Sequence, residues 1–123
     1  MEITPDDLNN DFLGSLGEEA VALLHGRFFE RLADKFLYAR AFGRNPAKAL
    51  EDDLAYYLQD DEQASGTASP SITVKYFRPG QSFLVAVVEC FTQFPGEKII
   101  LLNLIVTVGD SGMHVSLEGM SRA

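Results

Sequence analysis

The sequence is poor in the residues that most often carry chemistry. It has one cysteine, Cys90, and two histidines, His25 and His114, in 123 residues. A single cysteine cannot form an internal disulfide, which suits a reducing compartment such as the cytoplasm. Two histidines without further ligand spacing do not make a zinc site, and no calcium loop, phosphate loop or catalytic motif is found. The sequence therefore predicts no metal and no cofactor.

Basic charge and long apolar runs are also scarce. Lys and Arg number 10 against 18 Asp and Glu, so the formal net charge is -8. Nucleic-acid binding through a basic groove needs clustered Lys and Arg, and that class of function is excluded. The longest apolar run, Ile99 to Val108, is interrupted by Asn103 and is too short to cross a membrane. The first twelve residues lack the basic and apolar regions of a signal peptide, so we expect a cytoplasmic protein.

The segment from Ser82 to Val108 is rich in β-branched and aromatic residues and contains Pro95-Gly96 at its middle. It predicts a central β-hairpin that is apolar on both faces. At this length we expect one domain, residues 1–123, with a helical part (1–62), a flexible polar loop (63–71) and a sheet part (71–120).

Capping patterns predict about three helices before the loop. Thr4-Pro5 favours a short helix that Gly14 ends, and Ser15 to Glu18 has the spacing of a capping box. The second helix is expected to run from Ser15 to about Phe42 with Gly26 inside it. Asn45-Pro46 favours a third helix that ends in the acidic residues at 60–62.

Alternating or continuous apolar patterns predict four strands, over residues 71–77, 82–94, 99–108 and 113–117. Helices followed by strands indicate an α+β fold: N-terminal helices packed on one face of a four-stranded antiparallel meander, in two layers. This element order resembles cystatin-like and NTF2-like domains, although the NTF2-like pattern usually has a strand between its helices. The resemblance implies an alternative function, a small-ligand site or an enzyme pocket between helices and sheet.

Two-residue Pro-Gly loops would fix which side chains share a face of the sheet. Val74 would then lie opposite Val85, and Val85 opposite Val106. The helix-facing side is expected to carry Ile72, Val74, Tyr76, Phe83, Val85, Val87, Phe91, Ile100, Leu102, Leu104, Val106, Met113, Val115 and Leu117. A bulge at either turn would exchange the faces.

The opposite side is expected to have an apolar centre and polar edges, which is typical of an interaction surface. The residues predicted to bind a partner or a second copy of the chain are Lys75, Leu84, Ala86, Val88, Leu101, Asn103 and Ile105. The alternative is that the first helix or the acidic loop folds over this side.

Glu89 and His114 are weak catalytic candidates. The same register turns Glu89 into the core, where a carboxylate near Tyr57 or Tyr76 could act as a general base; a bulge would turn it outward instead. His114 alternates with Ser116 and Glu118 on one strand, but neighbours two residues apart do not form a triad.

Cys90 is expected to be a buried hydrophobic residue rather than a nucleophile.

Six acidic residues follow the start of the third helix and predict a solvated surface or a docking site for a basic protein: Glu51, Asp52, Asp53, Asp60, Asp61 and Glu62. The function expected from these observations is that of a non-enzymatic interaction protein, a small acidic adaptor, chaperone or inhibitor.

Overall fold

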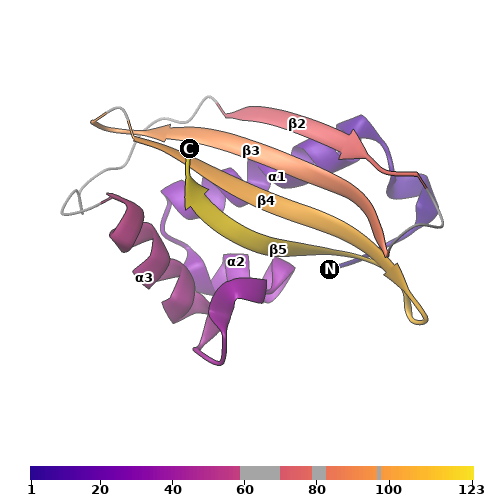
Figure 1. Ribbon diagram of the computed structural model, residues 1–123, viewed down its shortest axis with the longest axis horizontal. Helices are drawn as coiled ribbons and strands as arrows, with labels where there is room; N and C mark the ends of the chain where they lie inside the picture. Colours follow the sequence, from indigo (N-terminus) through magenta and orange to yellow (C-terminus); the bar gives the residue numbers. More distant parts are fainter. Residues whose placement is uncertain (59–69, 79–82, 97) are drawn as a thin grey trace.

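The computed structural model describes residues 1–58, 70–78, 83–96 and 98–123. Within these residues the chain forms one antiparallel sheet with the strand order β1-β5-β4-β3-β2; α1 and α2 lie behind one face of that sheet, and α3 lies at its side, next to β5 (Figure 1). The strands are β1 (Glu2–Ile3), β2 (Ser71–Tyr76), β3 (Leu84–Phe94), β4 (Lys98–Gly109) and β5 (Gly112–Arg122). The α-helices are α1 (Asn10–His25), α2 (Phe29–Phe36) and α3 (Pro46–Leu58), and short 3-10 turns cover Pro5–Asp7 and Ala39–Ala41.

The predicted two-layer α+β architecture is confirmed, and the predicted number of strands is wrong. The described sheet has five strands because β1 adds to its edge, where Glu2 pairs with His114 and Ile3 with Met113. A strand of two residues has no alternation that a sequence pattern could show. Between α2 and α3, Tyr38 also makes a single parallel bridge to Leu117.

The first predicted helix boundary is wrong. Residues Pro5–Asp7 form only a 3-10 turn, and the Asn9 side chain accepts a hydrogen bond from the Phe12 N–H at 2.8 Å. This cap begins α1 at Asn10, and the helix continues through Gly14 without a break. Gly14 therefore does not end a helix, and the capping-box pattern at Ser15 does not begin one.

The predicted long helix from Ser15 to Phe42 is two helices. Gly26 ends α1 as its C-cap, and Arg27 has a φ of 59°, outside the right-handed helical region. The second helix ends at Phe36, because Leu37 has a φ of 61°. The third helix begins at Pro46 as predicted. Its predicted end and most of the predicted loop, residues 63–69, lie outside the described residues, and Ser71 already belongs to β2.

Helix α1 approaches the sheet closely at Gly17. A Cβ atom built on Gly17 would lie 2.9 Å from Cys90 Sγ and 3.1 Å from Val88 Cγ1. Those distances are shorter than real Cβ atoms tolerate, so the missing side chain lets the helix backbone rest on β3.

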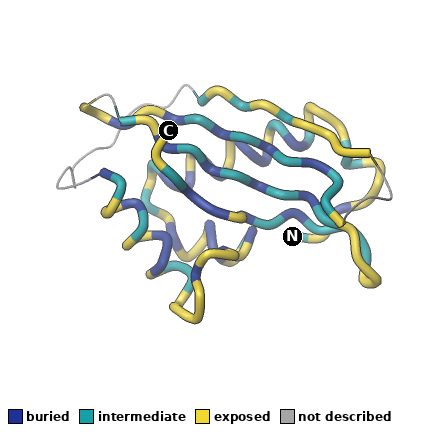
Figure 2. The backbone as a smooth tube through the Cα atoms, in the orientation of Figure 1, coloured by how far each residue is buried: buried dark blue, intermediate teal, exposed yellow. Residues whose placement is uncertain are grey.

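The core lies between this helical layer and alternate residues of the strands, which Figure 2 shows as a repeating buried pattern along β3 and β4. The fully buried residues of β3 to β5 are Ala86, Val88, Cys90, Ile100, Leu102, Leu104, Val106, Val115 and Leu117. For β4 and β5 these are residues that the sequence predicted to face the helices.

For β3 the predicted face is wrong. Phe94 pairs with Lys98, and Val87 pairs with Ile105, so the connection holds one residue more than a two-residue Pro-Gly loop. Because side chains alternate along a strand, one extra residue moves the whole set to the opposite face. Val87 and Phe91 therefore face away from the helices. Val85 lies at an irregularity between Leu84 and Ala86 and still packs against the core.

Candidate interaction surface

The side of the sheet turned away from the helices is a broad surface that we call the open face. No described helix or loop crosses it, and it is the side presented to the viewer in Figure 1. Its side chains come from all five strands: Glu2, Ser71, Thr73, Lys75, Leu84, Val87, Glu89, Phe91, Gln93, Ile99, Leu101, Asn103, Ile105, Thr107, His114, Ser116 and Ser121.

The centre of the open face is apolar. Phe91 lies opposite Leu101, and two residues further along Val87 lies opposite Ile105. All four are half-buried, although they do not pack against the buried core on the other side of the sheet. We call these four residues the apolar quartet. Their burial comes from their neighbours within the same face, so their outer surfaces remain available for contact.

A polar row divides the quartet. Glu89 of β3 lies between Val87 and Phe91 and pairs with Asn103 of β4, which lies between Leu101 and Ile105. Lys75 Nζ of β2 is 2.8 Å from Glu89 Oε1, and the Glu89 side chain is 25% exposed. The carboxylate is thus neutralised by a neighbouring strand on the same face.

Asn103 has an unsatisfied acceptor. Its Oδ1 atom is buried and accepts no hydrogen bond from any described residue. On the other side of Asn103, the paired residue of β5 is Gly119, which has no side chain that could donate one. A buried acceptor without a partner is uncommon in folded proteins and calls for an explanation.

The outer strands give the open face a polar rim. Ser71 and Thr73 of β2 lie at one side, and Ser116 and Ser121 of β5 lie at the other. An apolar centre within a rim of small polar residues is typical of surfaces that proteins use to bind one another.

Most of the residues predicted to bind a partner lie on this face. Lys75, Leu84, Leu101, Asn103 and Ile105 do so, and Leu84 is brought there by the irregularity that follows it. The placement of the other two predicted residues, Ala86 and Val88, is wrong: both are fully buried toward the helices. The sequence did not predict that Val87 and Phe91 lie on the open face. A three-residue connection after Phe94, in place of the two-residue loop that was assumed, would have placed them there.

The predicted inward orientation of Glu89 is also wrong. Because β3 is shifted by one residue, Glu89 faces away from the helices, and the alternative in which it turns outward is the observed one. No pocket between helices and sheet can therefore use Glu89 as a base. Of the tyrosines expected near it, Tyr76 donates a hydrogen bond to Asn10 Oδ1 at 2.7 Å.

The other reactive side chains are engaged in structural contacts. His114 Nε2 lies 3.2 Å from Ser111 Oγ in the last turn. His25 stacks on Phe94 with ring centroids 4.1 Å apart, and its Nε2 is 2.6 Å from Thr92 Oγ1. Cys90 is fully buried, and burial raises the pKa of its thiol to about 12, so it is a poor nucleophile at neutral pH.

The described part of the acidic cluster is largely paired. Asp53 accepts a hydrogen bond from the Tyr38 hydroxyl at 2.5 Å and lies 3.1 Å from Arg44 Nη1. Glu51 and Asp52 both form ion pairs with Lys48. Asp60, Asp61 and Glu62 lie outside the described residues.

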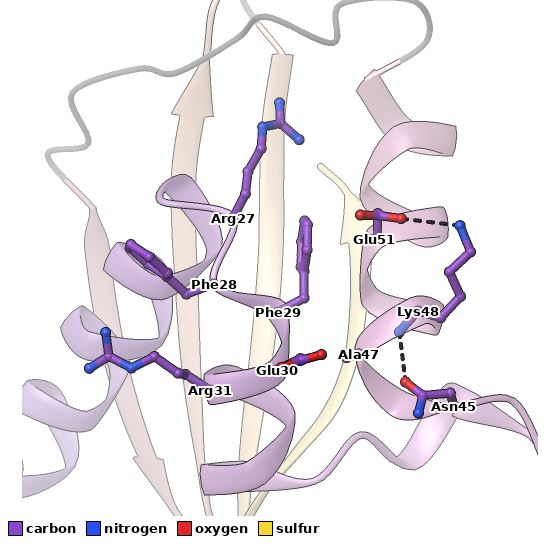
Figure 3. Close-up of a pocket in the computed structure, with 9 residues that line it drawn as sticks. All are labelled: Arg27, Phe28, Phe29, Glu30, Arg31, Asn45, Ala47, Lys48 and Glu51. Atoms are coloured by element: carbon purple, nitrogen blue, oxygen red, sulfur yellow. Dashed lines mark hydrogen bonds and ion pairs between the residues drawn. The ribbon is translucent and has the colours of Figure 1, made fainter.

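A cleft of about 530 Å³ lies between α2 and α3 (Figure 3). Its walls carry charges of both signs, and Glu30 and Glu51 point into the space between the helices while Arg31 turns away from it. The lining residues are Arg27, Phe28, Phe29, Glu30, Arg31, Asn45, Ala47, Lys48 and Glu51.

Among the described residues, no cluster of His, Cys, Asp and Glu is arranged to hold a metal ion. Nor does any helix in the described ranges have the length and apolar character needed to cross a membrane. Comparison with family models, with curated proteins and with solved structures finds no match to this chain.

Proposed function

We propose that this chain is a non-enzymatic interaction protein, a small acidic adaptor, chaperone or inhibitor of the cytoplasm. It uses the open face for self-association or for binding a protein partner. The observation that carries the proposal is the apolar quartet, which lies on the side of the sheet that no described element covers. Water-exposed apolar surface of this extent is a recurrent mark of a binding surface.

The size of the open face fits a stable complex. The strands β3 and β5 each have 11 residues. At about 3.4 Å per residue and about 4.8 Å between strands, β2 to β5 span roughly 650 Å² of flat area, since β2 has only 6 residues. Stable protein interfaces bury about 800 Å² on each partner. The open face alone therefore supplies most of the area that such an interface needs.

The test replaces Leu101 or Ile105 by Lys, because a buried charge on the partner-facing side opposes association. We expect each variant to keep its circular dichroism spectrum and to lose self-association, or a captured protein partner, in light scattering and pull-down experiments. The matched control is Ala55→Lys, which adds the same charge at an exposed position of α3. A wild-type protein that is a strict monomer, with pull-downs unchanged by either open-face variant, would contradict the proposal.

A small-ligand function is the second candidate, and the cleft between α2 and α3 is the observation in its favour. Its volume of about 530 Å³ lies within the range of ordinary ligand sites. Ala47→Trp would fill the cleft from α3. A small molecule retained in native mass spectrometry by the wild type and lost in Ala47→Trp would support this function, and a protein free of ligand would oppose it.

A further inference from the structure

The strand β2 is an uncovered edge of the sheet. It is the last strand in the order, whereas β5 near the opposite edge is covered in part by β1 and by the bridge from Tyr38 to Leu117. Within the described residues, no element pairs with the outer side of β2. An uncovered edge strand is where a sheet accepts a further strand, so the backbone of β2 calls for an extended segment as its occupant.

The register shows which backbone groups of β2 point outward. The Phe77 N–H donates a hydrogen bond to the Val85 oxygen at 2.9 Å. Bonded and non-bonded pairs alternate along an antiparallel ladder, so every second residue of β2 bonds to β3 and the residues between them do not. The N–H and C=O groups of Ile72, Val74 and Tyr76 therefore point away from β3, and no described residue forms a hydrogen bond with them.

Helix α1 presents an open flank beside the same edge. Its Asn10 Oδ1 atom accepts the hydrogen bond from Tyr76, and Gly17 lies against side chains of both β2 and β3. Gly14 follows Asn10 by one turn on the same side of the helix, and nothing lies within 4 Å of a Cβ atom built on it. Glycine inside a helix is destabilising relative to alanine, and no contact within the described chain accounts for this one.

A second copy of the chain fits the edge and the flank together. Antiparallel pairing of β2 with its own copy, centred on Val74, would form about six hydrogen bonds between the outward groups. Because α1 lies between β2 and β3 at Gly17, such pairing would place the two α1 helices roughly 10 Å apart, close to the usual spacing of packed helices. Gly14 of each copy would then lie near the two-fold axis. An unrelated extended peptide would pair with the strand but leave the flank of α1 uncovered.

The open-face side of this edge pairs without like-charge contact. In this register, Lys75 lies opposite Thr73 of the second copy, and Thr73 is next to Glu89 in its own copy. Each Lys75 thus gains a second carboxylate within reach, beyond the one that it already pairs with at 2.8 Å. Arg78, exposed just after β2, would face the start of the other β2, where the first residues carry no charge.

The helix side carries the charges that oppose pairing. Asp11 and Glu18 are exposed acids on the flank of α1, and pairing would bring those of the two copies nearer to each other. Exposed charges interact weakly in water that contains salt, whereas the strand pairing adds a ladder of backbone hydrogen bonds. This repulsion therefore weakens the pairing without preventing it.

We propose that this chain forms a two-fold dimer in which β2 pairs with β2 of a second copy, antiparallel around Val74, and the α1 helices pack at Gly14. The inference concerns an edge that the proposed function does not use, and it does not rest on that function. The dimer joins the two sheets into one and leaves the open face uncovered. The joined open face would measure roughly 1300 Å², twice that of one chain.

The first test places a cysteine at the two-fold axis. Helices roughly 10 Å apart, each with its Cα atoms about 2.3 Å from its own axis, bring facing Cα atoms to about 5–6 Å, which a disulfide spans. Gly14→Cys should therefore form a covalent dimer on mild oxidation. Ser15→Cys, exposed on the same helix but turned away from the edge, should not, and the native Cys90 is fully buried. Absence of the Gly14→Cys cross-link would overturn the inference.

The second test blocks the strand pairing. Val74→Pro removes an outward N–H, and edge strands tolerate proline where the N–H faces solvent. In a Gly14→Cys chain, Val74→Pro should keep the circular dichroism spectrum and lower the yield of cross-linked dimer about tenfold or more. Leu101→Lys on the open face should leave that yield unchanged. An undiminished cross-link in folded Val74→Pro, or its loss in folded Leu101→Lys, would overturn the inference. Since the cross-link reports only the β2 edge, the proposed function of the open face stands or fails separately.

Discussion

Glu89 of β3 lies directly opposite Asn103 of β4, and both side chains face away from the helical layer. This pair places a carboxylate and an amide between Val87 and Ile105 on one side and Phe91 and Leu101 on the other. Two rows of apolar contact with a polar row between them specify alignment better than a uniform apolar surface does, because only one register matches polar with polar groups.

Glu89→Leu is expected to tighten self-association about tenfold, equivalent to about 1.4 kcal/mol, because a carboxylate no longer has to be desolvated. Lys75 loses its ion-pair partner in this variant, but it lies on the edge strand β2 and is 58% exposed in the single chain, so its ammonium group can turn outward to water. Sedimentation equilibrium measures the change. The control Glu19→Leu removes one carboxylate of an ion pair, with Lys35, on the helical layer and should leave association unchanged. Weaker association of Glu89→Leu would contradict this role of Glu89.

Gly17→Ala is expected to lower the free energy of unfolding by roughly 1–3 kcal/mol, because the new methyl group would overlap Cys90 Sγ at 2.9 Å. Gly14→Ala on the same helix has no atom within 4 Å of the added Cβ. It should stabilise the protein by up to about 1 kcal/mol through helix propensity. Urea unfolding of the two variants gives the comparison, and equal effects would show that α1 does not contact β3 at Gly17.

Ionisation of the Tyr38 phenol should lower the free energy of unfolding at high pH. Burial, together with the hydrogen bond to Asp53, raises the pKa of the Tyr38 phenol above its usual value of 10.0. The folded state therefore holds this proton after the unfolded chain has lost it, so the contribution is complete below pH 10 and declines as the pH rises further. Tyr38→Phe lacks this titration, and the difference in unfolding free energy between wild type and variant should shrink above pH 10. A difference that stays constant would contradict the buried hydrogen bond.

Cys90 should resist thiol reagents in the folded protein. It is fully buried, and burial raises its pKa to about 12, so almost no thiolate is present at pH 8. We expect labelling by a disulfide reagent at pH 8 to be slow without denaturant and complete within minutes in 6 M guanidinium, a concentration of the order that unfolds even very stable domains. Rapid labelling of the native protein would show that the contact between α1 and β3 opens readily.

The layers of the fold could be predicted from the sequence, but the face of β3 could not. In β4 and β5, buried residues such as Leu104 and Leu117 alternate with more exposed ones along the strand. That alternation was sufficient to predict which side chains of these two strands face the helices. In β3, Val87 and Val88 are both β-branched and suit either face, so the hydrophobic pattern gives no register. Which side chains of β3 face the helices therefore depends on the length of the connection after Phe94. One additional residue in that connection turns every side chain of β3 to the opposite face of the sheet.

The predicted helix boundaries were wrong because they, too, depend on contacts between residues that are distant in the sequence. Gly14 suggests the end of one helix, and Gly17 lies in a capping-box pattern that suggests the start of another, yet α1 runs through both. At Gly17 the absence of a side chain serves the contact with β3, which no local pattern reveals. The polar centre of the candidate site, Glu89 opposite Asn103, likewise depends on a pairing between distant residues.

Methyl NMR on a dilution series tests the central claim most directly, because it reports each face of the sheet separately. The methyl signals of Val87, Leu101 and Ile105 should shift or broaden as the protein concentration rises, while those of Leu102 and Leu104, buried under the helices, should not change. Signals that are independent of concentration on the open face, or shifts confined to residues of the cleft between α2 and α3, would contradict self-association through the open face.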